Sequence, residues 1–171
     1  MHKFKPALLA TAFAAALALP AAHAADNQDF QVLIDIDASC DVVSTDNVDF
    51  DTQLAAPGTV DATGGVTVQC TRDQAYNVQL DGGQNSGNDV SDRRMLHANG
   101  TDTIAYQLYQ DAGRSTPWGE TDGTDTVSGT GTGFGSGAPY NQDHTVYARA
   151  TLAGTELAGA YEDTIKATVT F

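Results

Sequence analysis

DFQVLIDIDA, residues 29–38, is a stretch in which large apolar residues alternate with mostly polar ones. One face carries four large apolar side chains, those of Phe30, Val32, Ile34 and Ile36. Only Leu33 interrupts the other, polar face. A period of two predicts a β-strand with one buried side. Such a strand needs a long hydrophobic groove, and that groove lies either in the rest of this chain or in another subunit.

The residues before this stretch predict export. Lys3 and Lys5 give a positive start, residues 7–19 form an apolar run, and Ala22-His23-Ala24 fits a cleavage site of small residues. We expect cleavage after Ala24, because the apolar run is shorter than the roughly 20 residues of a membrane span. The predicted organisation is a signal peptide at 1–24, an N-terminal extension at 25–38 and one β-domain at 39–171.

The exported part of the chain is strongly acidic. It holds 6 basic and 22 acidic residues, a formal net charge of −16. This charge argues against nucleic acid as a partner, because binding nucleic acid requires a basic surface that neutralises phosphates. It also disfavours attachment to anionic lipid. We expect most of the carboxylates to form a solvated surface that resists aggregation.

The exported part contains two cysteines, Cys40 and Cys70, and no others. In an oxidising compartment such a pair predicts one disulfide, which closes a loop of about 30 residues and contributes on the order of 3 kcal/mol. A metal site is poorly supported, since the spacing is far from CxxC and only His97 and His144 remain as histidines after processing.

The chain after residue 38 has strand patterns and no window of 11 or more residues with a helical period. Alternating apolar residues predict strands at 66–71 and 76–80, joined as a hairpin, and at 103–111, 144–152 and 161–171. Shorter strands are expected near 40–44, 48–50, 93–96 and Val127, and Trp118 is expected to be a core anchor. Strand signals at intervals of roughly 8 to 15 residues predict one all-β antiparallel sandwich.

Several segments, in the same order and at similar spacing, resemble the spore coat U domain family, whose best-described members are subunits of archaic, Csu-type chaperone-usher pili. The matching segments are Cys40, VQCT (68–71), LDGG (80–83), Arg94-Met95, YQLYQDA (106–112), Trp118-Gly119, TVYAR (145–149), GAYEDT (159–164) and VTF (169–171). The chain departs from the family at Phe50-Asp51, where the family usually has Phe-Gly, so the turn there is expected to differ.

The resemblance implies an immunoglobulin-like sandwich that lacks its seventh strand and has an open apolar groove. In such systems a periplasmic chaperone fills the groove first, and the N-terminal extension of the next subunit then replaces it. Residues 29–38 are then the donor strand, with Phe30, Val32, Ile34 and Ile36 as its plugs. Ile165, Val169 and Phe171 are then at the groove edge, where the terminal carboxylate contacts a basic chaperone residue.

Other kinds of chemistry have weaker support. Paired carboxylates such as Asp35 with Asp37, or Glu162 with Asp163, suggest a glycosidase only loosely, and the family match gives Asp163 a structural role in binding a neighbouring loop. The acidic loops 81–89 and 122–125 suit calcium but match no EF-hand pattern. The glycine-rich run 129–137 lacks the lysine and the helix of a phosphate-binding loop.

These observations predict a non-enzymatic structural subunit of a cell-surface pilus that needs no cofactor and supports adhesion or biofilm formation. Its expected partners are neighbouring subunits, a periplasmic chaperone and an outer-membrane usher. The alternatives are a secreted spore-coat or matrix sandwich that completes its own fold, and a calcium-dependent binding module. The sequence does not distinguish insertion of the N-terminal strand into its own domain from insertion into a neighbour.

Overall fold

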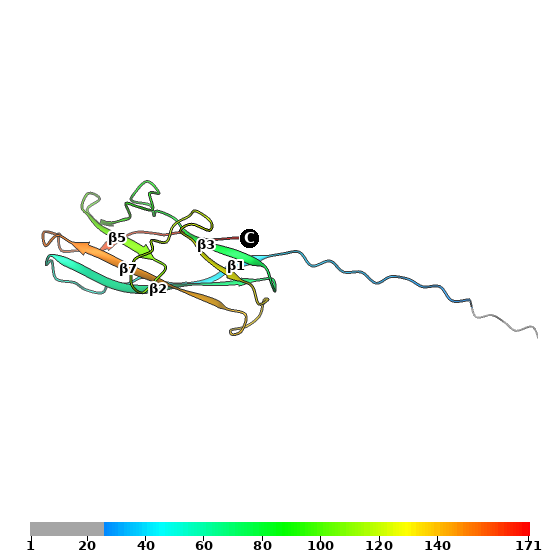
Figure 1. Ribbon diagram of the computed structural model, residues 1–171. Coiled ribbons are helices and arrows are strands. Elements are labelled where there is room, and N and C mark those ends of the chain that lie inside the picture. The colour runs from blue at the N-terminus through cyan, green and yellow to red at the C-terminus, as the bar shows by residue number, and fades with distance from the viewer. Residues whose placement is uncertain (1–25) are drawn as a thin grey trace, which may run out of the picture. The chain divides into compact units, whose positions relative to one another are not determined.

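The structure, a computed structural model, describes residues 26–171, so the predicted signal peptide at 1–24 lies outside the described residues. The chain falls into two units, residues 1–35 and residues 36–171. The second unit contains all the assigned strands (Figure 1). These are β1 (Cys40–Asp46), β2 (Gly58–Cys70), β3 (Ala75–Leu80), β4 (Arg94–His97), β5 (Thr103–Tyr109), β6 (Val127–Thr130), β7 (Gln142–Leu152), β8 (Tyr161–Glu162) and β9 (Ala167–Thr170).

The strands form two sheets in which every pair is antiparallel. One sheet has six strands in the order β1-β2-β7-β5-β4-β8, and the other has three in the order β6-β3-β9. The longest pairing joins β2 to β7, which lie side by side along the sandwich (Figure 1). The predicted all-β, immunoglobulin-like antiparallel sandwich is confirmed. Among the described residues, no helix is long and apolar enough to cross a membrane.

The core lies between the two sheets and is built from the inward faces of the strands. Val68 of β2, Val78 of β3 and Ala148 of β7 are fully buried. Trp118 is also fully buried, and its indole Nε1 donates a hydrogen bond to the carbonyl oxygen of Val78, 2.7 Å away. Trp118 is therefore the core anchor that its sequence context predicted, with its one polar atom satisfied.

The predicted disulfide is present. Cys40 and Cys70 are bonded to each other and are also direct pairing partners across β1 and β2. Cys40 is the first residue of β1 and Cys70 is the last residue of β2. The covalent bond therefore fixes the point at which the N-terminal residues enter the sandwich.

The predicted hairpin between residues 66–71 and 76–80 is wrong, because β2 and β3 belong to different sheets. Val66 of β2 already pairs with Thr45 of β1 on one side and with His144 of β7 on the other. No edge of β2 is free there for β3. The turn at 71–74, with Asp73 at a positive φ of 62°, carries the chain across to the smaller sheet instead.

The predicted single strand at 161–171 is also corrected, since it is divided between the sheets. Strand β8 pairs with β4 in the larger sheet, whereas β9 pairs with β3 in the smaller one. Between them, the backbone N–H of Lys166 donates to the carboxylate of Asp81, and the N–H of Asp81 donates to the carbonyl of Lys166. Alternation reports which face is buried but not which sheet a residue joins.

Arg93 is a structural residue that the sequence analysis did not identify. It is 1% exposed, and its guanidinium donates to the carbonyl oxygens of Leu80, Asp81 and Trp118 at 2.7 to 2.9 Å. It also donates to the side-chain oxygen of Gln107. Arg93 thus connects the end of β3, the Trp118 segment and β5. A buried charge is tolerated when its hydrogen bonds are satisfied in this way.

We expect Arg93→Lys to lower the free energy of unfolding by about 2 kcal/mol, because an ammonium cannot reproduce the planar set of donors and leaves buried carbonyls unpaired. Urea unfolding followed by fluorescence of Trp118 measures the change. The control is the neighbouring substitution Arg94→Lys, since the side chain of Arg94 is 41% exposed and its ion pair with Asp92 is weakened by solvent, so this change should have little effect on stability. Equal losses in both variants would contradict the role given to Arg93.

Candidate functional site

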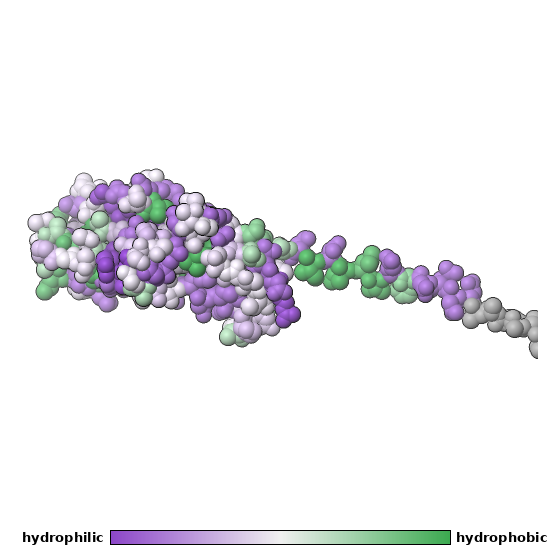
Figure 2. Space-filling model, in the orientation of Figure 1, coloured by the Kyte–Doolittle hydropathy of each residue, from purple (hydrophilic) through white to green (hydrophobic). Residues whose placement is uncertain are grey.

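The predicted donor residues are exposed in the structure. Phe30, Val32 and Ile34 are each at least 85% exposed, and Ile36 is 74% exposed. Figure 2 shows these apolar residues in green. No strand is assigned within residues 26–39. A β-strand needs a hydrogen-bonded neighbour, so the strand predicted at 29–38 stays a prediction that requires a partner strand.

Two strands of the sandwich have an open edge on the same side. Strand β9 pairs with β3 and with no other described strand, and β1 pairs only with β2. Some Cα atoms of β1 and β9 nevertheless lie within 8 Å of each other. The two edges belong to different sheets and are not bonded to each other. An open edge of this kind presents unpaired N–H and C=O groups that invite another strand.

A groove runs along this side of the sandwich. Its first part encloses about 670 Å³ between residues 45–50 and residues 161–167, over a floor that includes Val66, Leu80 and Leu108. Its second part encloses about 810 Å³ and is lined by residues 48–55 and 156–162 together with Met95 and Ile104. Both parts share Val48, Phe50 and Tyr161 as lining residues, so the two parts adjoin each other on this side.

A pair of glycines in β2 positions one wall of this groove. A Cβ atom on Gly64 would lie 2.6 Å from the carbonyl oxygen of Asp46 and 2.8 Å from a methyl carbon of Val48. The chain therefore passes directly over Gly64 when it leaves β1. This crossing lets Val48 and Phe50 pack against the core, where they face β8 and β9 across the groove. Two adjacent glycines inside a strand were the sequence signal for such a close approach.

Comparisons with known proteins identify the family. The family model of the Spore Coat Protein U domain matches residues 26–168. The chain belongs to this family. It is similar to Protein U of Myxococcus xanthus, with 37% identity over 114 residues, which cover 64% of this chain and 59% of that protein. The chain therefore spans less than two thirds of the length of this curated relative.

Among solved structures, the chain is similar to the CsuC-CsuE chaperone-tip adhesion subunit pre-assembly complex from archaic chaperone-usher Csu pili of Acinetobacter baumannii. The TM-score is 0.48 at 19% sequence identity. The match covers 78% of this chain and 40% of that chain.

The segments that resemble the spore coat U family include GAYEDT (159–164), and the structure explains the role of its aspartate. Asp163 accepts hydrogen bonds from the hydroxyl of Tyr106 at 2.7 Å and from Gln84 N and Asn85 Nδ2 at 2.9 Å. The predicted structural role of Asp163 in binding a neighbouring loop is thereby confirmed. Burial, followed by the bond to Asp163, raises the pKa of Tyr106. The phenol therefore stays protonated at the groove floor and donates to the carboxylate.

The acidic loops bind backbone and side-chain donors. Asp81 and Asp89 each accept a backbone N–H two residues ahead, and Asp125 accepts the N–H of Thr121. The hydrogen bonds from Ser91 lower the pKa of Asp89. In the part of the chain that the structure describes, no three His, Cys, Asp or Glu side chains are grouped so as to hold a metal ion. These carboxylates thus act as caps of their own loops.

The three predicted groove-edge residues lie in different surroundings. Ile165 lines the first part of the groove, and Val169 of β9 packs partly buried against the core. Phe171 is 59% exposed and follows β9. Ile165 thus contacts the groove directly, whereas Val169 belongs to the strand with the open edge. Contact of these residues with a chaperone stays a prediction.

Asp51 adopts the backbone conformation that a glycine prefers, with a φ of 55°. The turn therefore keeps a glycine-like geometry at the position where family members usually have glycine. Its N–H donates to the carboxylate of Asp49 at 2.8 Å, which helps to hold this conformation. An aspartate tolerates the left-handed region at a modest cost, and whether the turn at Phe50-Asp51 differs from that of family members stays a prediction.

We expect Asp51→Gly to raise the free energy of unfolding by roughly 0.5 kcal/mol, because relief of left-handed strain exceeds the entropy that glycine loses on folding. Thr52→Gly is the control, since Thr52 is equally exposed and has no positive φ. That control should lose stability. Urea unfolding of both variants measures the difference, and a destabilised Asp51→Gly protein would contradict the strain assigned to this turn.

Proposed function

We propose that this protein is a non-enzymatic structural subunit of a surface pilus that assembles by donor-strand complementation. The observation that carries the proposal is the presence of two complementary features in one chain. A groove with an apolar floor lies between two open strand edges, and an N-terminal segment exposes four large apolar side chains at every second position. Residues 29–38 of one subunit would fill the groove of the next.

The energies are adequate for a durable joint. Burial of Phe30, Val32, Ile34 and Ile36 at about 1.5 to 3 kcal/mol each contributes on the order of 6 to 12 kcal/mol before ordering costs. Backbone hydrogen bonds to the edge of β9 add to this, at about 1 kcal/mol each. The plugs span roughly 20 Å as a strand, at about 3.4 Å per residue.

The same groove would require protection before assembly, because an open apolar edge promotes aggregation. The resemblance to archaic pilus subunits implies a periplasmic chaperone that covers it and an outer-membrane usher that exchanges the chaperone for a subunit. The protein would then pass through the periplasm to the cell surface. Adhesion or biofilm formation is the role that this resemblance implies for the assembled filament.

The test substitutes one plug and compares it with its neighbour. Ile34→Asp should abolish polymerisation, because a carboxylate would be buried without a partner in the apolar groove, while secretion and the Cys40–Cys70 disulfide persist. Leu33→Asp is the matched control. Leu33 falls on the opposite face of the strand, so the Leu33→Asp protein should still assemble. The measurement is the ladder of oligomers that resist SDS without boiling, together with electron microscopy of filaments.

Normal filaments from the Ile34→Asp variant would count against the donor assignment. A stable monomer of the unaltered mature protein, with residues 29–38 inserted in its own groove, would favour the self-complete secreted sandwich instead. Sedimentation of the mature protein expressed without a chaperone separates these outcomes. An aggregate or a strand-swapped oligomer supports the pilus subunit.

A further inference from the structure

We infer that consecutive copies of this chain make a second contact, in which the loop 131–141 of one copy packs through Phe134 against Leu54 and Leu157 of the copy that receives its N-terminal segment. This inference rests on the proposed function, because it needs residues 29–38 to lie in a neighbour's groove. It adds a separate apolar interface between the ends of the two sandwiches.

The first step concerns Ser39 and Cys40, the residues that attach the N-terminal segment to the sandwich and form its root. The backbone N–H of Thr71 donates to the carbonyl of Ser39 at 2.9 Å, and the N–H of Ser39 donates to the hydroxyl of Thr71 at 2.9 Å. The next residue, Cys40, is held by the disulfide. Only two residues separate the last plug, Ile36, from this fixed root. The Cα atoms of Ile36 and Ser39 are therefore at most about 11 Å apart, at 3.3 to 3.6 Å per residue.

The second step concerns what lies beside that root. Loop 131–141 is bonded to the end of β2 and the turn that follows it, since Gly133 N donates to Cys70 O and Asp73 N donates to Gly131 O, both at 2.9 Å. The side-chain amide of Gln69 also binds both backbone groups of Gly135.

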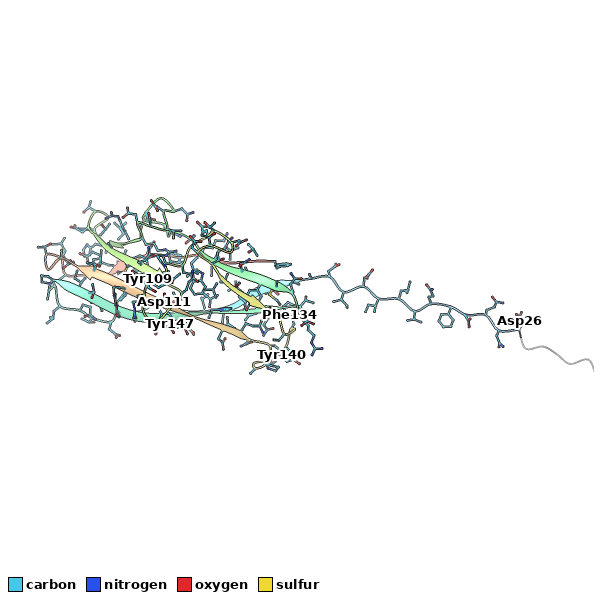
Figure 3. The ribbon with its side chains drawn as sticks, in the orientation of Figure 1. Asp26, Tyr109, Asp111, Phe134, Tyr140 and Tyr147 are labelled. Atoms are coloured by element: carbon cyan, nitrogen blue, oxygen red, sulfur yellow. A yellow bond between two sulfur atoms is a disulfide. The ribbon has the colours of Figure 1, made fainter. Side chains whose placement is uncertain are left out.

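Phe134 is on this loop, 45% exposed. Figure 3 shows Phe134 and Tyr140 at the same end of the sandwich. The ring of Tyr140 covers Gly135, which leaves no room there for a side chain. The loop is thus held by several contacts, and Phe134 projects from a fixed base.

The third step concerns the direction of entry. Every strand pair in the sandwich is antiparallel, so we take the incoming strand to run antiparallel to the open edge of β9. Phe30 then lies toward the end of β9, and Ile36 lies toward β8. The second part of the groove, lined by Leu54, Leu157 and Tyr161, is at that end. The root of the incoming segment therefore meets the rim formed by Leu54 and Leu157.

The rim itself is apolar and exposed. Leu54 is 86% exposed and Leu157 is 50% exposed. Figure 2 shows green, apolar residues at the end of the sandwich where β2 begins and β7 ends. In a chain with a net charge of −16 after processing, such a patch is unusual and suits an apolar partner. Phe134 of the next copy has the matching chemistry, and a head-to-tail contact between unlike surfaces extends into a filament.

The experiment is cross-linking of the polymer made by the full exported chain. In the double variant Phe134→Cys, Leu157→Cys, mild oxidation should join successive copies, giving multimers that survive boiling in SDS and collapse on reduction. Each single variant is the control. A chain with one added cysteine can at most be joined into pairs, so multimers require both positions to meet.

The two proposals fail in different ways. A double-cysteine variant that forms the SDS-resistant ladder before boiling, and yet gives no multimers after oxidation and boiling, would overturn the end-to-end contact. That result would leave donor-strand assembly supported. Absence of the ladder in the unaltered protein would overturn both.

A second measurement avoids added cysteines. The variant Phe134→Ser should still form the unboiled ladder but lose it at a lower temperature than the unaltered protein, since Phe134 lines neither part of the groove and serves only the end-to-end contact. Phe134→Leu is the matched control, because it keeps a large apolar side chain at this position and should dissociate close to the temperature of the unaltered protein. An unchanged dissociation temperature in the Phe134→Ser variant would contradict the contact.

Discussion

The outer edge of β9, which no other described strand covers, is the constraint on which the rest of this structure depends. Its N–H and C=O groups border an apolar groove, so they are satisfied by water only while the groove stays wet. The floor of the groove is complete, with Leu80, Leu108 and Val146 packed in the core. Among the described residues, this side of the sandwich has open strand edges over a complete hydrophobic core. The domain can therefore be stable while the groove is still open.

Two networks of hydrogen bonds hold the residues beneath the groove in place, although one side of the groove is open. Arg93 binds the carbonyls at the end of β3 and beside Trp118, while Asp163 joins Tyr106 to the loop that follows β3. Both clusters are buried or half-buried and are satisfied by several hydrogen bonds. Such networks favour one arrangement of the chain, because any other arrangement leaves a charge or a carbonyl unpaired. The groove can therefore keep its shape before it is filled.

Much of the fold was predictable from alternation alone, and the exceptions have a common cause. The strands at 103–109 and 142–152, the disulfide and the buried Trp118 follow from residue type and period. The errors at 66–80 and 161–171 concern strand partners, because side-chain alternation identifies a buried face and carries no information on which sheet supplies the neighbour. Arg93 was missed because an arginine at the start of an expected short strand gives no signal of burial. The glycine pair that accommodates the wall was missed because it lies just before the strand expected at 66–71.

The position of the Cys40–Cys70 bond has a mechanical consequence. If the N-terminal segment is held by a neighbour, tension along the filament enters the domain at Ser39 and Cys40. The sulfur bridge passes that force straight to the end of β2, a strand that pairs with β1 on one side and, as far as Val68, with β7 on the other. Strand β1 is an edge strand, so without the disulfide a pulling force would break its hydrogen bonds to β2 one after another. With the disulfide, the force bypasses these hydrogen bonds.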